Sequence, residues 1–168
     1  MNDIITRLRN KKDDEGFTLI ELLVVVVIIG VLVAIAVPVY LNYRKGAADK
    51  SAQSDVRGAV STIEQYYTDN GNTYPTANRV KNQASFNIGT TAAPAAGDPA
   101  PAGWVTLSDK TQMTYIAGAA TSGTVSTYKV CALNTNGSGK LYVYDSSVGG
   151  SVKTYGTGVN IDDCTGTA

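Results

Sequence analysis

The stretch DDEGFTLIELL, residues 13–23, places three acidic residues directly before Gly16 and a fourth, Glu21, inside the apolar run that follows. Residues 22–37 are apolar apart from one glycine, and residues 17–41 are long enough, as a helix, to cross a hydrocarbon layer of about 30 Å. A carboxylate at the centre of such a helix costs roughly 2.5–3.5 kcal/mol on insertion scales. We therefore predict a functional role and a partner for Glu21.

Basic residues flank this run unequally. Two follow it closely, Arg44 and Lys45, whereas several precede it: Arg7, Arg9, Lys11 and Lys12. Because loops rich in lysine and arginine stay on the cytoplasmic side, the bias predicts a cytoplasmic N-terminus and an exported remainder.

Two ordinary interpretations of the run remain incomplete. A secretory signal peptide is one, since AIA at residues 34–36 offers a small-x-small cleavage site, and cutting near Ala36 would release an exported soluble binding module. An uncleaved membrane anchor is the other. Neither explains Glu21 or the acidic residues before Gly16.

A third interpretation follows from a resemblance. The short charged leader, Gly16 and the sequence FTLIELLVVVVIIGVLVAIAVPVYLNY (residues 17–43) resemble the class III signal of type IV pilins and pseudopilins. The resemblance implies that a prepilin peptidase cuts after Gly16, that Phe17 becomes the methylated N-terminus, and that the apolar segment stays on the mature chain. It also implies that Glu21 meets the N-terminal amine of a neighbouring subunit, where ammonium and carboxylate would compensate each other.

Apolar residues recur at spacings of three and four beyond the membrane run: Ala52, Val56, Ala59, Val60, Ile63, and Tyr66 or Tyr67. This stripe predicts that one helix continues from residue 17 to about residue 69, with its second half packed on a globular domain. Pro38 removes a backbone donor and Gly30 is a further weak point. The resemblance to the family favours a segment between Gly30 and Pro38 that unwinds in the filament. The alternative is that a membrane helix simply tolerates both residues without unwinding.

The sequence DNGNTYP, residues 69–75, predicts the end of the helix, and it also resembles the helix end of many pilins. Residues 90–103 are rich in alanine and proline, and we predict that they form an exposed connection. From Trp104 onward, short β-rich runs (WVTL, MTYIA, VSTYKVCAL and KLYVYD) predict an antiparallel sheet that covers the apolar stripe of the helix.

The expected fold class is therefore α+β, with a long N-terminal helix packed against a C-terminal antiparallel β-sheet. The expected organisation is a leader (1–16), a transmembrane and assembly half of the helix (17–46), and a globular domain (47–168). Within that domain we expect helix to about residue 70, a loop over 71–103, and the β-sheet region over 104–168.

Two cysteines, Cys131 and Cys164, lie late in the chain. In an exported protein such a pair indicates a disulfide, which would restrict the unfolded chain by roughly 3–4 kcal/mol on the loop-entropy model. A C-terminal disulfide is also frequent in pilins.

Composition argues against several other functions. The 14 basic and 14 acidic residues cancel, without the basic patch of a nucleic-acid-binding protein, and there is no histidine to act as general base or metal ligand. Asp145, Asp162 and Asp163 could surround calcium, as in some major pseudopilins, but no loop has the ordered oxygen spacing of a calcium motif. We predict no catalytic site, cofactor or metal.

The favoured function is a structural subunit, a major pilin, that forms a homo-oligomeric helical filament. Its expected partners are prepilin peptidase, the pilus or secretion assembly machinery, and membrane lipid before assembly, with no specific nucleic acid. It would lie in the cytoplasmic membrane first and in a surface pilus afterwards. A pseudopilin of a type II secretion or DNA-uptake filament is the alternative within the family.

Overall fold

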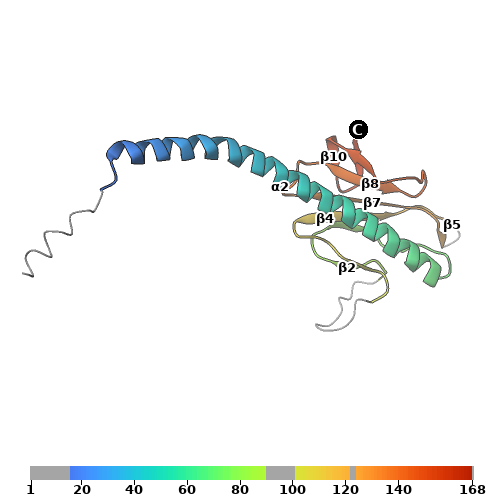
Figure 1. Ribbon diagram of the computed structural model, residues 1–168. Coiled ribbons are helices and arrows are strands. Elements are labelled where there is room, and N and C mark those ends of the chain that lie inside the picture. Colours follow the sequence, from blue (N-terminus) through green and yellow to red (C-terminus); the bar gives the residue numbers. More distant parts are fainter. Residues whose placement is uncertain (1–15, 90–100, 122–123, 168) are drawn as a thin grey trace, which may run out of the picture. The chain divides into compact units, whose positions relative to one another are not determined.

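The computed structural model describes residues 16–89, 101–121 and 124–167 of the chain. One long helix, α2 (Leu19–Asp69), precedes a set of strands, and the backbone divides into two compact units, Met1–Leu41 and Asn42–Ala168. Figure 1 shows the strands gathered beside the second half of α2. The predicted α+β fold, with a long N-terminal helix and a C-terminal antiparallel sheet, is confirmed.

The main sheet has five antiparallel strands in the order β1-β4-β7-β8-β9. Three two-stranded ribbons accompany it, pairing β2 with β3, β5 with β6, and β10 with β11. The bounds are β1 (Arg79–Asn82), β2 (Phe86–Asn87), β3 (Trp104–Val105), β4 (Thr111–Ala117), β5 (Ala120–Thr121), β6 (Thr124–Val125), β7 (Tyr128–Asn134), β8 (Leu141–Asp145), β9 (Lys153–Tyr155), β10 (Thr157–Asn160) and β11 (Thr165–Thr167).

The predicted apolar stripe of α2 forms one wall of the main core. Four of its members are fully buried, Ala52, Val56, Ala59 and Ile63, and they pack with alternate residues of the central strands β4 and β7. Val60, Tyr66 and Tyr67 lie partly buried at the margin of the same core. Because these positions repeat every three or four residues, one face of the helix meets the sheet along its whole globular half.

The helix ends where the sequence predicted. Asp69 is its last residue, and Gly71 and Asn72 follow with φ values of 65° and 60°. The Asn72 amide donates to the Tyr67 carbonyl at 3.0 Å, so the left-handed turn satisfies one of the last helical carbonyls.

The prediction of a structureless loop over 71–103 is wrong in part, because β1 and β2 lie within it. Strand β1, with the sequence RVKN, pairs with β4 at the edge of the sheet, and its register shifts between Arg79 and Asn82. An edge strand with a bulge needs little apolar patterning, which is why its sequence gave no strand signal. Most of the exposed connection predicted over 90–103 lies outside the described residues.

Three carboxylates on α2 bind the sheet side of the unit through neutral donors. Asp49, which is buried, accepts from the amide and hydroxyl of Ser138 in the turn between β7 and β8. Asp55 accepts from the amide and hydroxyl of Ser108, each at 2.9 Å. Glu64 accepts from the phenols of Tyr74 at 3.0 Å and Tyr128 at 2.8 Å. Hydrogen bonds to charged acceptors are stronger than neutral ones, so these contacts fix the helix on the sheet.

The tyrosines around Glu64 form a connected aromatic cluster. The ring of Tyr128 lies 4.7 Å from that of Tyr74 and 5.7 Å from that of Tyr144, measured between centroids. Burial, together with the bond to Glu64, raises the pKa of Tyr74 to about 12 and raises the pKa of Tyr128 further. The folded state therefore favours the neutral phenols.

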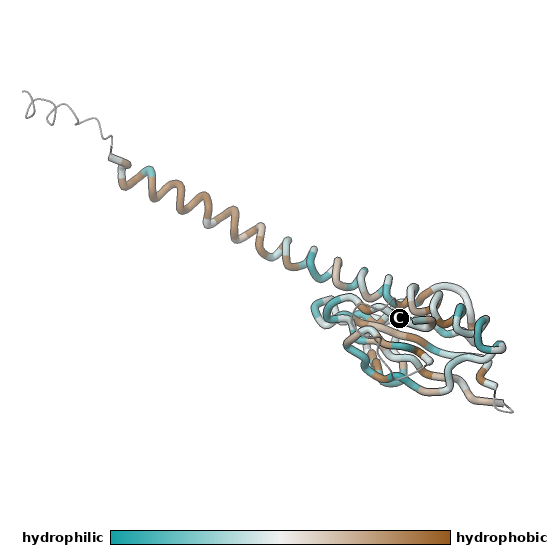
Figure 2. Tube along the Cα trace, turned by 90° about the horizontal axis from the view of Figure 1, so that it is seen from below, coloured by the Kyte–Doolittle hydropathy of each residue, from teal (hydrophilic) through white to brown (hydrophobic). Residues whose placement is uncertain are grey.

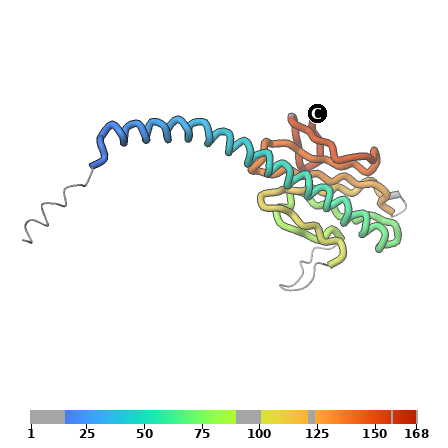
Figure 3. Tube along the Cα trace, viewed as in Figure 1, coloured from blue at the N-terminus to red at the C-terminus, as the bar shows by residue number. Residues whose placement is uncertain are grey.

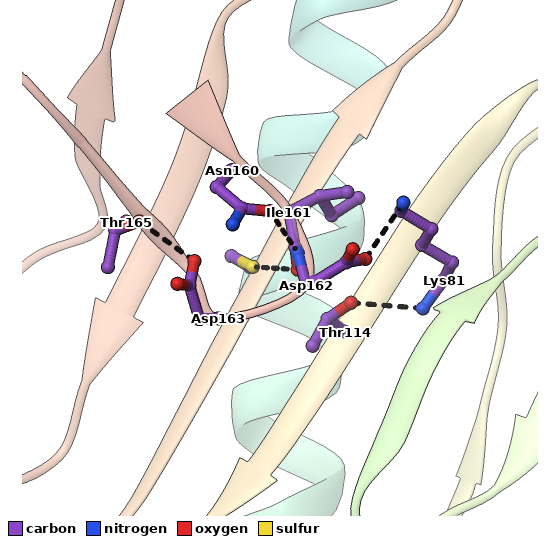
Figure 4. A network of polar contacts seen from close by, with 8 residues as sticks. Lys81, Thr114, Asn160, Ile161, Asp162, Asp163 and Thr165 are labelled. Carbon is purple, nitrogen blue, oxygen red and sulfur yellow. Dashed lines mark hydrogen bonds and ion pairs between the residues drawn. The ribbon is translucent and has the colours of Figure 1, made fainter. Parts of the chain in front are cut away.

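The sheet has a second covered face, which the sequence analysis did not predict. Alternate residues of β7 point to opposite sides: Val130 and Ala132 join the core beneath α2, whereas Cys131 packs with Leu141, Ile161 and Cys164. The C-terminal segment, red in Figure 3, supplies this second cover, and Figure 4 shows its turn in front of the strands with α2 behind them. The sheet is thus enclosed between the helix and the C-terminal segment.

The contact between Asp49 and the β7–β8 turn predicts a strict need for glycine at position 137. A Cβ on Gly137 would lie 2.2 Å from Asp49 Oδ1 and 3.1 Å from the Asn134 carbonyl, so Gly137→Ala should destabilise the globular unit by about 1–3 kcal/mol. Gly58→Ala is the matched control, because a Cβ there meets nothing and alanine favours helix by about 1 kcal/mol. Thermal unfolding of the full chain in detergent should show a lower midpoint for the first variant and a higher one for the second. Equal midpoints would contradict the packing of this turn.

The buried phenols predict loss of stability in alkali. Because the native pKa of Tyr128 is raised, its contribution is fully present below about pH 10, the unfolded value, and declines as pH rises above it. Tyr128→Phe should lower the melting midpoint at pH 8, by removing a bond to Glu64, and should make the decline above pH 10 shallower. Tyr43→Phe, at a side chain 80% exposed, is the control and should change neither. A Tyr128→Phe profile as steep as that of the parent would refute the assignment.

Candidate processing and assembly site

The first half of α2 exposes a continuous apolar surface. Every described residue from 16 to 47 is exposed, and Figure 2 shows the hydrophobic colouring that runs along the helix in its N-terminal half. This helix is the one in the described residues that is long and apolar enough to cross a membrane. An apolar surface of this extent requires a cover, either lipid or other protein.

Gly16 and Phe17 lie just before the helix begins. Neither has helical structure, and the Phe17 side chain is 76% exposed. A Cβ built on Gly16 would contact no described atom within 4 Å, so the described part of the fold does not require glycine there. A residue without a side chain does, however, suit a protease that must bind an extended segment.

Thr18 caps the helix together with Glu21. The Thr18 amide donates to Glu21 Oε2 at 2.9 Å, and the Thr18 hydroxyl donates to the same oxygen at 2.7 Å. In return the Glu21 amide donates to Thr18 Oγ1 at 3.3 Å, and the Leu22 amide donates to the Thr18 carbonyl at 3.3 Å. This is a capping box, in which a threonine and a glutamate three residues later satisfy each other's backbone amides.

The sequence analysis singled out Glu21 and missed Thr18. The signal was present, because TLIE at residues 18–21 has the threonine-x-x-glutamate spacing of a capping box. It was overlooked because the helix was expected to begin at residue 17, whereas α2 begins at Leu19. The two residues that precede the helix are thus the cap and the residue expected to become the N-terminus.

Gly30 and Pro38 lie within α2, which continues through both positions. Proline contributes no amide to the helical ladder, so the carbonyl one turn earlier has lost its backbone donor. A Cβ on Gly30 would meet nothing within 4 Å. Unwinding between these residues in a filament stays a prediction.

Cys131 and Cys164 form a disulfide in the globular unit, with their Cα atoms 5.6 Å apart. Both are buried, and the turn before Cys164 is held further by an ion pair of 2.9 Å between Asp162 and Lys81 (Figure 4). Because half of each side chain in that ion pair is exposed, the disulfide is the stronger of the two attachments.

The aspartates considered for calcium have other partners. Asp145 binds Lys129 at 3.0 Å, and Asp162 binds Lys81. Asp163 accepts from the hydroxyl of Thr165 at 2.8 Å. In the part of the chain that the structure describes, no group of three or more histidine, cysteine, aspartate or glutamate side chains converges on a point.

Comparison with known proteins identifies the N-terminal segment. The family model described as the prokaryotic N-terminal methylation motif matches residues 11–37, which include Gly16, Phe17, Thr18 and Glu21. In this segment, the chain is similar to type IV pilins and pseudopilins.

Relatives of the pilin family fall into two groups. The chain is 41% identical over 61 residues to fimbrial protein EcpC of Eikenella corrodens, which covers 36% of this chain and 40% of that protein. It is 40% identical over 57 residues to type IV major pilin protein PilE1 of Neisseria gonorrhoeae, or 34% of each chain. It is also 38% identical over 72 residues to type II secretion system core protein G of Escherichia coli K12, covering 43% of this chain and 49% of that protein.

The chain thus spans less than half the length of these curated relatives of the pilin family. No solved structure matches it.

Proposed function

We propose that this chain is a structural subunit of a type IV pilus. In this proposal a prepilin peptidase cuts after Gly16, Phe17 becomes the methylated N-terminus, and the assembly machinery polymerises the product into a helical filament of identical subunits. The observation that carries the proposal is the exposed apolar half of α2, which has the capped carboxylate of Glu21 in its first turn and continues into a globular unit with its own core.

The apolar half of α2 suits two successive surroundings. Lipid would cover it while the chain is held in the cytoplasmic membrane with its N-terminus inside, and the same halves of neighbouring subunits would cover it in the filament. In the filament, the neighbour's ammonium would compensate Glu21, and this pairing would favour one stagger between subunits over others.

Processing would create the partner that Glu21 needs. Before cleavage the nitrogen of Phe17 belongs to a peptide bond and carries no charge. After cleavage it is an amine that binds a proton at neutral pH. Removal of the leader therefore supplies the cation that assembly requires.

Within the family we favour a major pilin of a surface filament. The disulfide supports this proposal, because it fixes the C-terminal segment over the second face of the sheet and so suits a subunit exposed outside the cell. The likeness to type II secretion system core protein G supports the alternative, a pseudopilin of a secretion or DNA-uptake filament. Immunolabelled electron microscopy of cells distinguishes them: long surface filaments favour the pilin, and their absence favours the pseudopilin.

The proposal assigns no catalytic chemistry, cofactor, metal or nucleic-acid ligand to this chain. Cleavage and methylation are assigned to the peptidase, and movement of subunits is assigned to the machinery in the membrane. What the chain contributes is a processed N-terminus, an apolar helix and a stable globular unit.

Replacement of Glu21 tests this function. Glu21→Val should leave insertion and cleavage after Gly16 intact, whereas filament incorporation should fall by at least about 100-fold, since an unpaired buried ammonium costs roughly 3–5 kcal/mol. The expected order of incorporation is Glu, Asp, Gln and Val, because aspartate keeps the charge with a shorter reach and glutamine keeps only hydrogen bonding. The measurement is the sheared filament fraction from cells with no parental copy.

Glu64→Gln is the matched control, because Glu64 is the other glutamate beyond Gly16 and lies in the globular unit. It should lower the melting midpoint and leave incorporation within about twofold of the parent, a change that corresponds to less than 1 kcal/mol. If Glu21→Val assembled as efficiently as the parent, the proposed role of Glu21 in assembly would be wrong.

A further inference from the structure

The capping box uses the two oxygens of Glu21 unequally. Both the amide and the hydroxyl of Thr18 donate to Oε2, at 2.9 and 2.7 Å. Among the described residues no hydrogen bond to Oε1 is found, although an ionised carboxylate accepts on both oxygens. One oxygen is therefore occupied by the chain's own cap, and the other remains able to accept.

The cap also restricts where the carboxylate can lie. A free glutamate side chain samples many rotamers and can reach a partner above or below its own helical turn. Because Oε2 is bonded to two groups of Thr18, which lies one residue beyond Phe17, the carboxylate is held at the first turn of α2. Oε1 is thereby held at one level along the helix.

We propose that Thr18 is a positioning residue for the pairing of subunits. It holds Glu21 through Oε2, so that Oε1 receives the N-terminal ammonium of the neighbouring copy in one register. This inference rests on the proposed function of Glu21. It adds that the acid acts as half of a threonine–glutamate unit, and that the stagger of subunits depends on both members.

The same unit explains how the precursor tolerates a carboxylate in an apolar segment before any neighbour is available. Two donors already bind the charge within one chain, and the Glu21 amide in the first turn of the helix, which otherwise lacks a partner, is satisfied in return. Assembly would then add the ammonium at Oε1 without breaking the cap, so no hydrogen bond is lost when subunits pair.

Substitution at position 18 tests the proposal with a close pair of variants. Thr18→Val keeps the shape and the amide but removes the hydroxyl, and with it the contacts of 2.7 and 3.3 Å. Thr18→Ser keeps the hydroxyl. The filament fraction should fall by about tenfold for Val, the equivalent of one charge-assisted bond, and should stay within about twofold of the parent for Ser.

The double variant Thr18→Val with Glu21→Val separates positioning from a merely structural effect. If Thr18 acts through Glu21, the double variant should assemble as poorly as Glu21→Val alone, whereas independent effects would multiply. Intact mass confirms in each case that the chain has been cut after Gly16.

A spectroscopic measurement on the uncut chain avoids any dependence on cleavage. The full chain in lipid bilayers is labelled with ¹³C at its glutamate carboxyl carbons, and Glu21→Gln identifies the signal of Glu21. Thr18→Val should shift that signal and Thr18→Ser should restore it, since the hydroxyl bonds directly to the labelled group.

The outcomes distinguish this inference from the proposed function. If Glu21→Val loses assembly while Thr18→Val assembles as the parent does, Thr18 has no positioning role and the function of Glu21 stands. An unchanged Glu21 signal in Thr18→Val would likewise overturn the inference. If Glu21→Val itself assembles normally, the proposed pairing fails, and the inference fails with it.

Discussion

Glu21 carries a carboxylate into an apolar segment, and an apolar surrounding tolerates such a group only when hydrogen bonds or an opposite charge compensate it. Much of the N-terminal architecture follows from this constraint. Thr18 supplies the hydrogen bonds within the chain, and the helix begins at Leu19 because Thr18 serves as its cap. In the proposed function, the opposite charge would arise when the peptide bond between Gly16 and Phe17 is cut. Compensation of this one acid would then link helix capping, processing and assembly.

The helix has different requirements in its two halves. Up to residue 47 no side chain is buried, and from Asp49 onward one face is buried at every turn. In the globular half, carboxylates accept from serine and tyrosine donors and hold the sheet in place, and among the described residues they form no ion pair with lysine or arginine. The proposed assembly contacts and the folding contacts therefore involve separate residues, so we expect a variant of Glu21 to lose assembly while the globular unit keeps its fold.

Sequence reasoning predicted the features that depend on strong local patterns, and it missed those that depend on distant contacts. The stripe from Ala52 to Ile63 and the glycine–asparagine helix end were predictable because spacing and turn chemistry are local. Strand β1 was not, because it forms only by pairing with β4. The second face of the sheet was missed because its cover comes from the C-terminal segment, whose short strands β10 and β11 have little apolar character. The capping role of Thr18 was readable in the sequence but required the correct helix start.

The central claim is that the apolar half of α2 stays on the mature protein behind a new N-terminus at Phe17. Intact mass of the protein isolated from cells tests it most directly, because each possible cleavage leaves a chain of different mass. The account predicts a chain that begins at Phe17 and carries one added methyl group. A chain that begins at Val37 would show a signal peptide cut after Ala36, and a chain that keeps residues 1–16 would show an uncleaved anchor. Either of these results would contradict the account.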